Sequence, residues 1–200
     1  MSGMRLIGIT GSIGSGKSTV LRWLADHGAK VWDADEAVHR LYRPGQEGWK
    51  AIQALWGEEI LDADGRVNRK RIAARVFGQP EERRRLEAAI HPLVLQDLLR
   101  TAGDLQSTGA LWCAAPLLYE GGWEKEFTTI VCVWSPPELT RERLKSRGLT
   151  DAEISARFAA QENPDEKLRR ADHGVINSGN LELLHEQCRR LYQLLLHINP

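Results

Sequence analysis

The chain has 200 residues, 42% of them hydrophobic, which is enough to bury a sizeable core in one domain or in a core with an insertion. Its 27 basic residues balance 27 acidic residues, so no net field favours nucleic acid or an anionic membrane surface. No stretch is long and apolar enough to span a membrane, and the N-terminus carries no apolar targeting segment. The sequence therefore predicts a soluble protein with neither a nucleic-acid nor a membrane partner.

The three cysteines are Cys113, Cys132 and Cys188. The first two lie in apolar runs typical of core strands, where a thiol acts as a small hydrophobic side chain. No Cys-x-x-Cys pair is present, so neither a zinc site nor a disulfide framework is expected. Few cysteines, without a predicted disulfide framework, indicate a cytoplasmic protein.

The N-terminal segment combines a strand, a glycine-rich loop and a helix. Residues 6–10 predict a short buried strand and residues 17–27 a helix, and residues 11–18 between them read Gly-Ser-Ile-Gly-Ser-Gly-Lys-Ser. Such a loop directs successive backbone N–H groups at one point, beside the positive end of the helix dipole. In this pattern Lys17 reaches the β- and γ-phosphates and the Ser18 hydroxyl binds Mg²⁺. We interpret the loop as a nucleoside triphosphate site. The alternative is a glycine-rich turn with an incidental lysine, which would not need a strand before it and a helix after it.

Two carboxylates follow the second predicted strand, residues 29–32, and precede a helix expected over residues 36–41. Ligands of parallel sheets sit at the carboxyl ends of the strands, so Asp33 and Asp35 can face the γ-phosphate. A carboxylate there can take the proton of an acceptor hydroxyl or serve Mg²⁺. An aspartate before a helix is also a good N-cap. Both roles stay open for Asp33, whereas for Asp35 we favour chemistry.

The middle of the chain, residues 49–106, shows almost no strand pattern. Asn68 can cap a helix that reaches residue 77, and a further helix is expected over residues 80–90. His91 and Pro92 break that pattern, so a separate helix is predicted from residue 93 to about 105. We expect this helical block to be an insertion that covers the substrate.

The C-terminal half returns to alternating strands and helices. Strands are predicted over residues 110–115, 129–134 and 174–177, and helices over residues 137–147, 150–161 and 181–196. Strands separated by helices predict a parallel sheet with right-handed crossovers.

Several arginines and one histidine are candidate binding residues. Arg143 and Arg147 are four residues apart and share a helix face, which suits a mobile lid over a triphosphate. The alternative is that these arginines are ordinary surface residues. For Arg141 we prefer this alternative. His91 is equally compatible with a helix cap and with a substrate contact.

Two classes of nucleotide-binding protein are excluded by missing motifs. A GTPase needs an Asn-Lys-x-Asp motif for guanine, which is absent. A motor ATPase or helicase needs an acidic residue after an apolar strand, and here the strand ends Cys-Ala-Ala-Pro at residues 113–116.

Further motifs occur in a fixed order along the chain. They are the glycine-rich loop within residues 9–19, Asp-Ala-Asp at 33–35, Leu-Glu-x-x-x-His-Pro at 86–92, Pro-Leu-Leu-Tyr-Glu at 116–120, Arg-Leu-x-x-Arg at 143–147, Arg-x-x-x-Gln at 157–161 and Val-Ile-Asn at 175–177. In this combination the chain resembles the dephospho-coenzyme A kinase family. It departs from the family at Ser12, where glycine is usual, and in a lid that is one residue shorter between Arg147 and Thr150.

The resemblance implies transfer of the γ-phosphoryl group of ATP to the ribose 3′-hydroxyl of dephospho-coenzyme A. It implies an α/β fold, with a P-loop kinase core whose parallel sheet is flanked by helices, a helical substrate-binding insertion and a mobile lid. The core would comprise residues 1–45 and 108–200, with the lid at about 147–170, and the helical coenzyme A domain residues 46–107.

The resemblance also assigns residues to roles. The catalytic residues would be Asp35 as general base, Lys17 as phosphate anchor and Arg143 as a lid arginine. ATP would be bound by Gly14, Ser15, Gly16, Lys17, Ser18, Thr19, Arg147 and Asn177. The acceptor would contact Asp35, Arg69, His91 and Tyr119. Mg²⁺ would be bound by Ser18, phosphates and water.

Two other functions remain open at this stage. One is a kinase for another nucleoside or for a sugar alcohol, and the other is a regulatory module that binds ATP and a protein partner without transfer. The expected assembly is a monomer or a small homo-oligomer.

Overall fold

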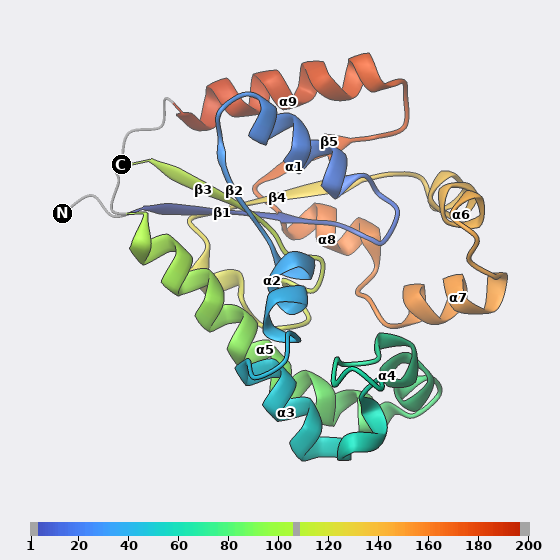
Figure 1. Ribbon diagram of the computed structural model, residues 1–200. Helices are drawn as coiled ribbons and strands as arrows, with labels where there is room; N and C mark the ends of the chain where they lie inside the picture. Colours follow the sequence, from blue (N-terminus) through green and yellow to red (C-terminus); the bar gives the residue numbers. More distant parts are fainter. Residues whose placement is uncertain (1–3, 106–108, 197–200) are drawn as a thin grey trace. The chain divides into compact units, whose positions relative to one another are not determined.

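The computed structural model describes residues 4–105 and 109–196 (Figure 1). Its contacts divide the chain into two compact units. The first unit comprises Met1–Asp33 with Leu105–Pro200, and the second comprises Ala34–Asp104. The boundary expected between residues 107 and 108 lies at positions outside the described residues.

The first unit is built on a five-stranded parallel sheet, as the strand–helix alternation predicts. Its strands are β1 (Arg5–Thr10), β2 (Lys30–Asp33), β3 (Ala110–Ala114), β4 (Thr129–Trp134) and β5 (His173–Ile176). Their order is β2-β3-β1-β4-β5, so β1 lies in the middle between β3 and β4. Every neighbouring pair is parallel, and the carboxyl ends of all five strands therefore meet at one edge.

Helices cover both faces of this sheet. Helices α1 (Lys17–Asp26) and α9 (Leu181–Leu196) pack against each other on one face, while α8 (Pro164–Arg170) packs against β4 on the other (Figure 1). Ile7, Leu24 and Val133 are members of the buried cluster under α1 and α9. This core fixes the start of α1 over the sheet edge at which the strands end.

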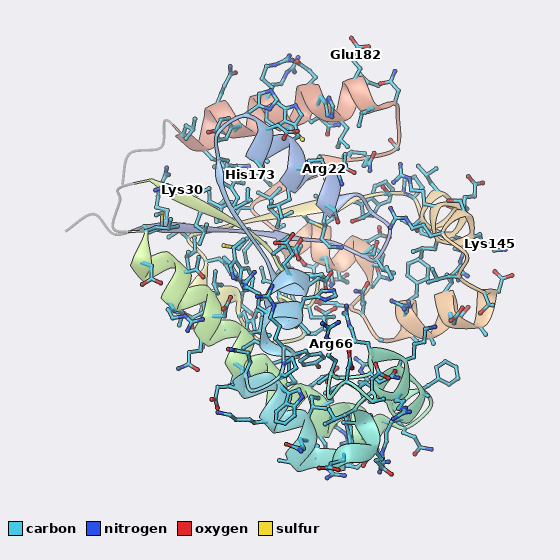
Figure 2. All side chains as sticks on the ribbon, viewed as in Figure 1. Arg22, Lys30, Arg66, Lys145, His173 and Glu182 are labelled. Atoms are coloured by element: carbon cyan, nitrogen blue, oxygen red, sulfur yellow. The ribbon has the colours of Figure 1, made fainter. Side chains whose placement is uncertain are left out.

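Two more helices of this unit follow β4. Helix α6 (Pro137–Ser146) and helix α7 (Asp151–Ala159) pack on each other. The Arg141 guanidinium lies 5.2 Å from the centre of the Phe158 ring. Lys145, which projects from α6 in Figure 2, pairs with Asp151 at 2.9 Å. Packing and charge thus join the two helices across the short turn between them.

The second unit is helical, as the absence of a strand pattern predicts. It contains α2 (Ala34–Leu41), α3 (Glu47–Trp56), the short 3₁₀ helix η1 (Glu58–Ile60), α4 (Arg69–Val76) and α5 (Pro80–Asp104). Asn68 caps α4 by accepting the Arg71 N–H at 2.9 Å, which confirms the predicted cap. Helix α5 packs against α2, α3 and α4.

The prediction that His91 and Pro92 end a helix is wrong. Helix α5 runs through both residues without interruption. Proline removes one N–H from the helical ladder, but it does not prevent the helix from continuing where packing favours it. Ile90, Val94 and Leu98 are buried on either side of Pro92, and their packing carries the helix past the missing hydrogen bond. The cap role considered for His91 is therefore also wrong, because this residue lies inside the helix.

The structure also differs from the sequence-based prediction at two helices. Helix α2 starts at Ala34, so Asp35 lies in its first turn and Asp33 directly precedes it. Helix α8 was not predicted, because its sequence, Pro-Asp-Glu-Lys-Leu-Arg-Arg, has almost no apolar periodicity. A charged helix of seven residues gives little pattern to detect.

A capping box begins α7. The Thr150 hydroxyl accepts the Glu153 N–H, and the Glu153 carboxylate accepts the Thr150 N–H at 2.8 Å. The Thr150 N–H, followed by the Thr150 hydroxyl, which also donates to this carboxylate at 2.8 Å, lowers the pKa of Glu153 below its ordinary value. A lowered pKa in the folded state means that the carboxylate stabilises α7 above its unfolded pKa and stops doing so as the pH falls through the folded pKa.

We therefore expect Thr150→Ala to lower the free energy of unfolding by about 1 kcal/mol at neutral pH. The difference should shrink in acid, where Glu153 is protonated. Urea titrations of the wild type, Thr150→Ala and Thr150→Ser at pH 7 and pH 3 measure both effects. Thr150→Ser keeps the hydroxyl and is the control, so an equal loss in both variants would contradict the capping role.

Candidate functional site

The glycine-rich loop lies between β1 and α1, at the carboxyl end of the central strand. Gly11, Gly14 and Gly16 have φ angles of 141°, 78° and 105°, a region that side chains strain. A Cβ atom at Gly11 would lie 2.2 Å from the Val133 carbonyl oxygen, and one at Gly16 would lie 2.3 Å from Asn177 Nδ2. Glycine at these positions is thus required both by conformation and by space.

The loop leads into the first turn of α1, where Lys17 and Ser18 lie. Lys17 Nζ donates to the carbonyl oxygens of Gly11 and Ser12, at 2.9 and 2.8 Å. Its ammonium group is thereby folded over the loop. Ser18 is exposed in the first turn of the helix, where the N–H groups and the helix dipole favour an anion.

Hydroxyl groups of this region are buried without hydrogen-bond partners among the described residues. They are Thr10 Oγ1, Ser12 Oγ and Ser15 Oγ. Most buried polar groups in proteins are paired, so three such oxygens next to an amide-lined loop indicate that a polar ligand or water completes the site.

Arg143 on α6 reaches the flank of the loop. It donates to Ser135 Oγ at 3.0 Å and lies 3.4 Å from the Gly14 carbonyl oxygen and 3.3 Å from Asn177 Oδ1. Burial, followed by the like charge of Arg147, lowers the pKa of Arg143. A partly buried guanidinium group beside the loop, with a second positive charge near it, favours the binding of an anion.

Asn177 and Ser135 hold the other side of the loop. Asn177 is 7% exposed, and its Nδ2 donates to the Ser15 carbonyl oxygen at 2.8 Å. Ser135 Oγ lies 2.6 Å from the Asn177 carbonyl oxygen and 3.1 Å from that of Ser15. We did not predict a role for Ser135, although it directly follows the carboxyl end of β4, the same type of position that pointed to Asp33.

Tyr119 lies in the loop after β3. Its ring is 8% exposed, and the Arg170 guanidinium lies 3.9 Å from the ring centre. Its hydroxyl is buried without a hydrogen-bond partner among the described residues. Burial raises the pKa of Tyr119 to about 12, so the hydroxyl stays protonated at neutral pH and can donate to a ligand.

The remaining predicted residues belong to the helical unit. Asp35 is exposed in the first turn of α2. Arg69, the first residue of α4, donates to the ring of His39 on α2. His91 is half-buried within α5. Burial raises the pKa of Tyr42 to about 12, against the opposing charge of Arg69. The helical unit thus contains the cationic side chain of Arg69, the imidazole ring of His39 and the protonated phenol of Tyr42.

No group of three or more His, Cys, Asp or Glu side chains suited to a metal ion occurs within residues 4–105 and 109–196. Such a group is not required for Mg²⁺, which keeps several waters and is commonly held by substrate phosphates and one or two protein oxygens. The exposed Ser18 hydroxyl beside an anion-binding loop fits this type of site. In the same parts of the chain, none of the helices combines the length and the apolar composition that a bilayer crossing needs.

Comparisons with known proteins give a consistent result. The family model described as dephospho-CoA kinase matches residues 5–182. A dephospho-CoA kinase of Symbiobacterium thermophilum is 41% identical over 92% of this chain and 78% of its own length. One of Anaeromyxobacter dehalogenans is 43% identical over 94% of this chain and 90% of its own.

Solved structures share the fold. A protein of Thermus thermophilus superimposes with a TM-score of 0.82 and 34% identity, over 99% of this chain and 100% of its own. Dephospho-CoA kinase from Campylobacter jejuni gives a TM-score of 0.70 and 25% identity, over 96% of both chains. A shikimate kinase from Acinetobacter baumannii, at a TM-score of 0.54 and 20% identity over 99% of this chain and 97% of its own, shares the fold alone.

Proposed function

The chain belongs to the dephospho-CoA kinase family, and we propose that it transfers the γ-phosphoryl group of ATP to the ribose 3′-hydroxyl of dephospho-coenzyme A. The products are coenzyme A and ADP. The observation that carries this proposal is the family match over residues 5–182, which includes both the glycine-rich loop and the whole helical unit. A match to the loop alone would support only nucleotide binding.

The donor side of the reaction is assigned to the first unit. The N–H groups of the loop and of the first turn of α1, residues 14–19, bind the β- and γ-phosphates. Lys17 leaves the carbonyl oxygens of Gly11 and Ser12 and turns to these phosphates. Arg143 and Arg147 stabilise the charge on the transferred group, which is the main task of a protein in phosphoryl transfer. We assign Asn177 to the adenine side of ATP, and its bond to the Ser15 carbonyl oxygen ties that side to the loop.

The acceptor side is assigned to Asp35, Arg69, His91 and Tyr119. Asp35 orients the ribose hydroxyl and takes its proton as the new O–P bond forms. Arg69 carries a positive charge, and dephospho-coenzyme A carries phosphate groups that such a charge attracts. Tyr119 can donate its buried hydroxyl. Mg²⁺, when bound with ATP at Ser18, neutralises charge on the phosphate oxygens.

The function is tested by an acceptor panel. ADP release is measured with ATP and, in turn, dephospho-coenzyme A, adenosine, nucleoside monophosphates and gluconate. The proposal predicts that dephospho-coenzyme A gives the highest kcat/KM, by at least two orders of magnitude. Preference for another acceptor would identify a different kinase, and tight ATP binding without any turnover would indicate a regulatory module.

We also propose that the protein acts in the cytoplasm, where ATP is available and buried thiols stay reduced. Cys113, Cys132 and Cys188 are all free and buried. Its assembly as a monomer or a small homo-oligomer can be measured by sedimentation.

A further inference from the structure

Gln161 connects the end of α7 to the glycine-rich loop. Its Oε1 accepts the Ile13 N–H at 2.9 Å, although the two residues lie 148 positions apart in the sequence. Gln161 follows α7, which ends at Ala159, and precedes α8, which begins at Pro164. The joining segment can be followed between α7 and α8 in Figure 1.

The residue after Gln161 is held by a second, independent contact. The Glu162 N–H donates to Glu120 Oε1 at 2.8 Å. Glu120 lies in the loop after β3, so residues 161 and 162 bind two different loops at the carboxyl edge of the sheet. Side chain and main chain together fix the orientation of this segment.

A buried ion pair fixes Glu120 in turn. Lys167 on α8 is fully buried, and its ammonium group lies 2.7 Å from Glu120 Oε1. It also donates to the Pro116 carbonyl oxygen at 2.8 Å. Burying a lysine is costly and gains little net stability even when the charge is paired, so stability alone explains this arrangement poorly. We call Gln161, Glu120 and Lys167 the brace.

The brace acts on the loop at Ile13, next to parts of the loop that other elements contact. Asn177 Nδ2 donates to the Ser15 carbonyl oxygen and lies close to Gly16, and Gly14 packs on Leu144 and Thr140 of α6. Ile13 is bound by Gln161. Its peptide plane sets the direction in which the chain enters Gly14, where the phosphate-binding amides begin.

We propose that Gln161 is a positioning residue for the phosphoryl donor, which holds the loop at Ile13 in the conformation that binds the phosphates of ATP. The inference rests on the proposed function, because it assigns the brace to the ATP side of that site. Glu120 and Lys167 act through Gln161. The brace organises the loop before the nucleotide arrives, so that less ordering is needed on binding.

The test is Gln161→Leu, which keeps the size of the side chain and removes the acceptor. The dissociation constant of the magnesium complex of AMPPNP, a non-hydrolysable ATP analogue, is measured by calorimetry. Loss of one hydrogen bond that orders the loop should raise it about tenfold. The KM for dephospho-coenzyme A should stay within twofold of the wild-type value.

Gln187→Leu is the matched control. Gln187 Oε1 accepts the Ile176 N–H at 2.9 Å, a bond of the same type and length on the edge strand β5. Asn177, which follows Ile176, keeps its own bond from its N–H to the Trp134 carbonyl oxygen. Gln187→Leu should lower the unfolding temperature at least as much as Gln161→Leu and leave AMPPNP affinity unchanged.

A double-mutant cycle tests the rest of the brace. Glu120→Gln should weaken AMPPNP binding about threefold alone and add nothing in the Gln161→Leu background, because both changes act on the same contact. Additive losses would contradict the brace. AMPPNP affinity that is unchanged or tighter in Gln161→Leu would overturn the positioning role, and the tighter result would mean that Gln161 competes with the nucleotide for Ile13.

These results separate the two proposals. If the wild type phosphorylates dephospho-coenzyme A and Gln161→Leu binds AMPPNP normally, only the positioning role is lost. If the wild type binds AMPPNP but phosphorylates no acceptor, the proposed function is lost, while the comparison of Gln161→Leu with Gln187→Leu still decides the inference.

Discussion

Arg143→Ala is expected to lower kcat for the phosphorylation of dephospho-coenzyme A by about 10³-fold. The guanidinium group is placed beside the phosphate-binding loop by Ser135, Asn177 and the Gly14 carbonyl oxygen. Charge spreads over the oxygens of the transferred phosphoryl group as the old bond breaks, and a preorganised cation stabilises that charge most in the transition state. Steady-state kinetics with saturating ATP measure the loss.

The matched control for this prediction is Arg141→Ala. Arg141 lies on the same helix and its guanidinium covers the Phe158 ring, which gives it a packing role. Its removal should leave kcat within threefold. A loss below tenfold in Arg143→Ala, with ATP affinity unchanged, would show that Arg143 is a surface arginine.

Asp35→Asn is expected to lower kcat by about 10²-fold or more while ATP affinity changes little. Asparagine keeps the size and a hydrogen-bonding oxygen, but it cannot take the proton of the ribose hydroxyl. The decrease should therefore be in kcat rather than in the KM for ATP. Single-turnover measurements with a rapid quench isolate the chemical step from product release.

Glu36→Gln is the matched control for Asp35→Asn. Glu36 lies next to Asp35 in the first turn of α2 and is also exposed, so its substitution removes the same charge from the same turn. It should leave kcat nearly unchanged. Equal losses in the two variants would mean that the charge of this turn matters and that Asp35 is no proton acceptor.

The donor side of the site could be predicted because its chemistry is local in sequence. A strand, a loop with three glycines and a helix follow each other within residues 5–26, and backbone geometry places their N–H groups at one point. The structure also shows why glycine is needed. At Gly16, for example, Asn177 Nδ2 lies so close that a Cβ atom would collide with it. That reason depends on a residue 161 positions away, which no local pattern contains.

The contacts that hold the loop from outside could not be predicted for the same reason. Ser135, Gln161 and Lys167 are common polar residues in segments without a diagnostic spacing. Lys167 gives the clearest example, because a lysine in a charged stretch is normally exposed, whereas here it is fully buried beside Glu120. Only the pairing of α8 with the loop after β3 explains its position.

The error at Pro92 shows how packing can override a local preference. Proline is the strongest helix breaker in the sequence, and the prediction of two helices followed from it. Helix α5 continues because it packs against α2 and α3 and has buried residues on both sides of Pro92. The charged helix α8 is the opposite case, since it has little local signal and is held by a buried ion pair.

The central claim is that this chain phosphorylates dephospho-coenzyme A at the expense of ATP. The most direct measurement follows ADP and coenzyme A together, by chromatography and mass spectrometry, in a reaction of the purified protein with ATP, Mg²⁺ and dephospho-coenzyme A. The account predicts one coenzyme A, phosphorylated on the ribose 3′-oxygen, for each ADP. Release of ADP without coenzyme A, or a phosphoryl group at another position, would contradict it.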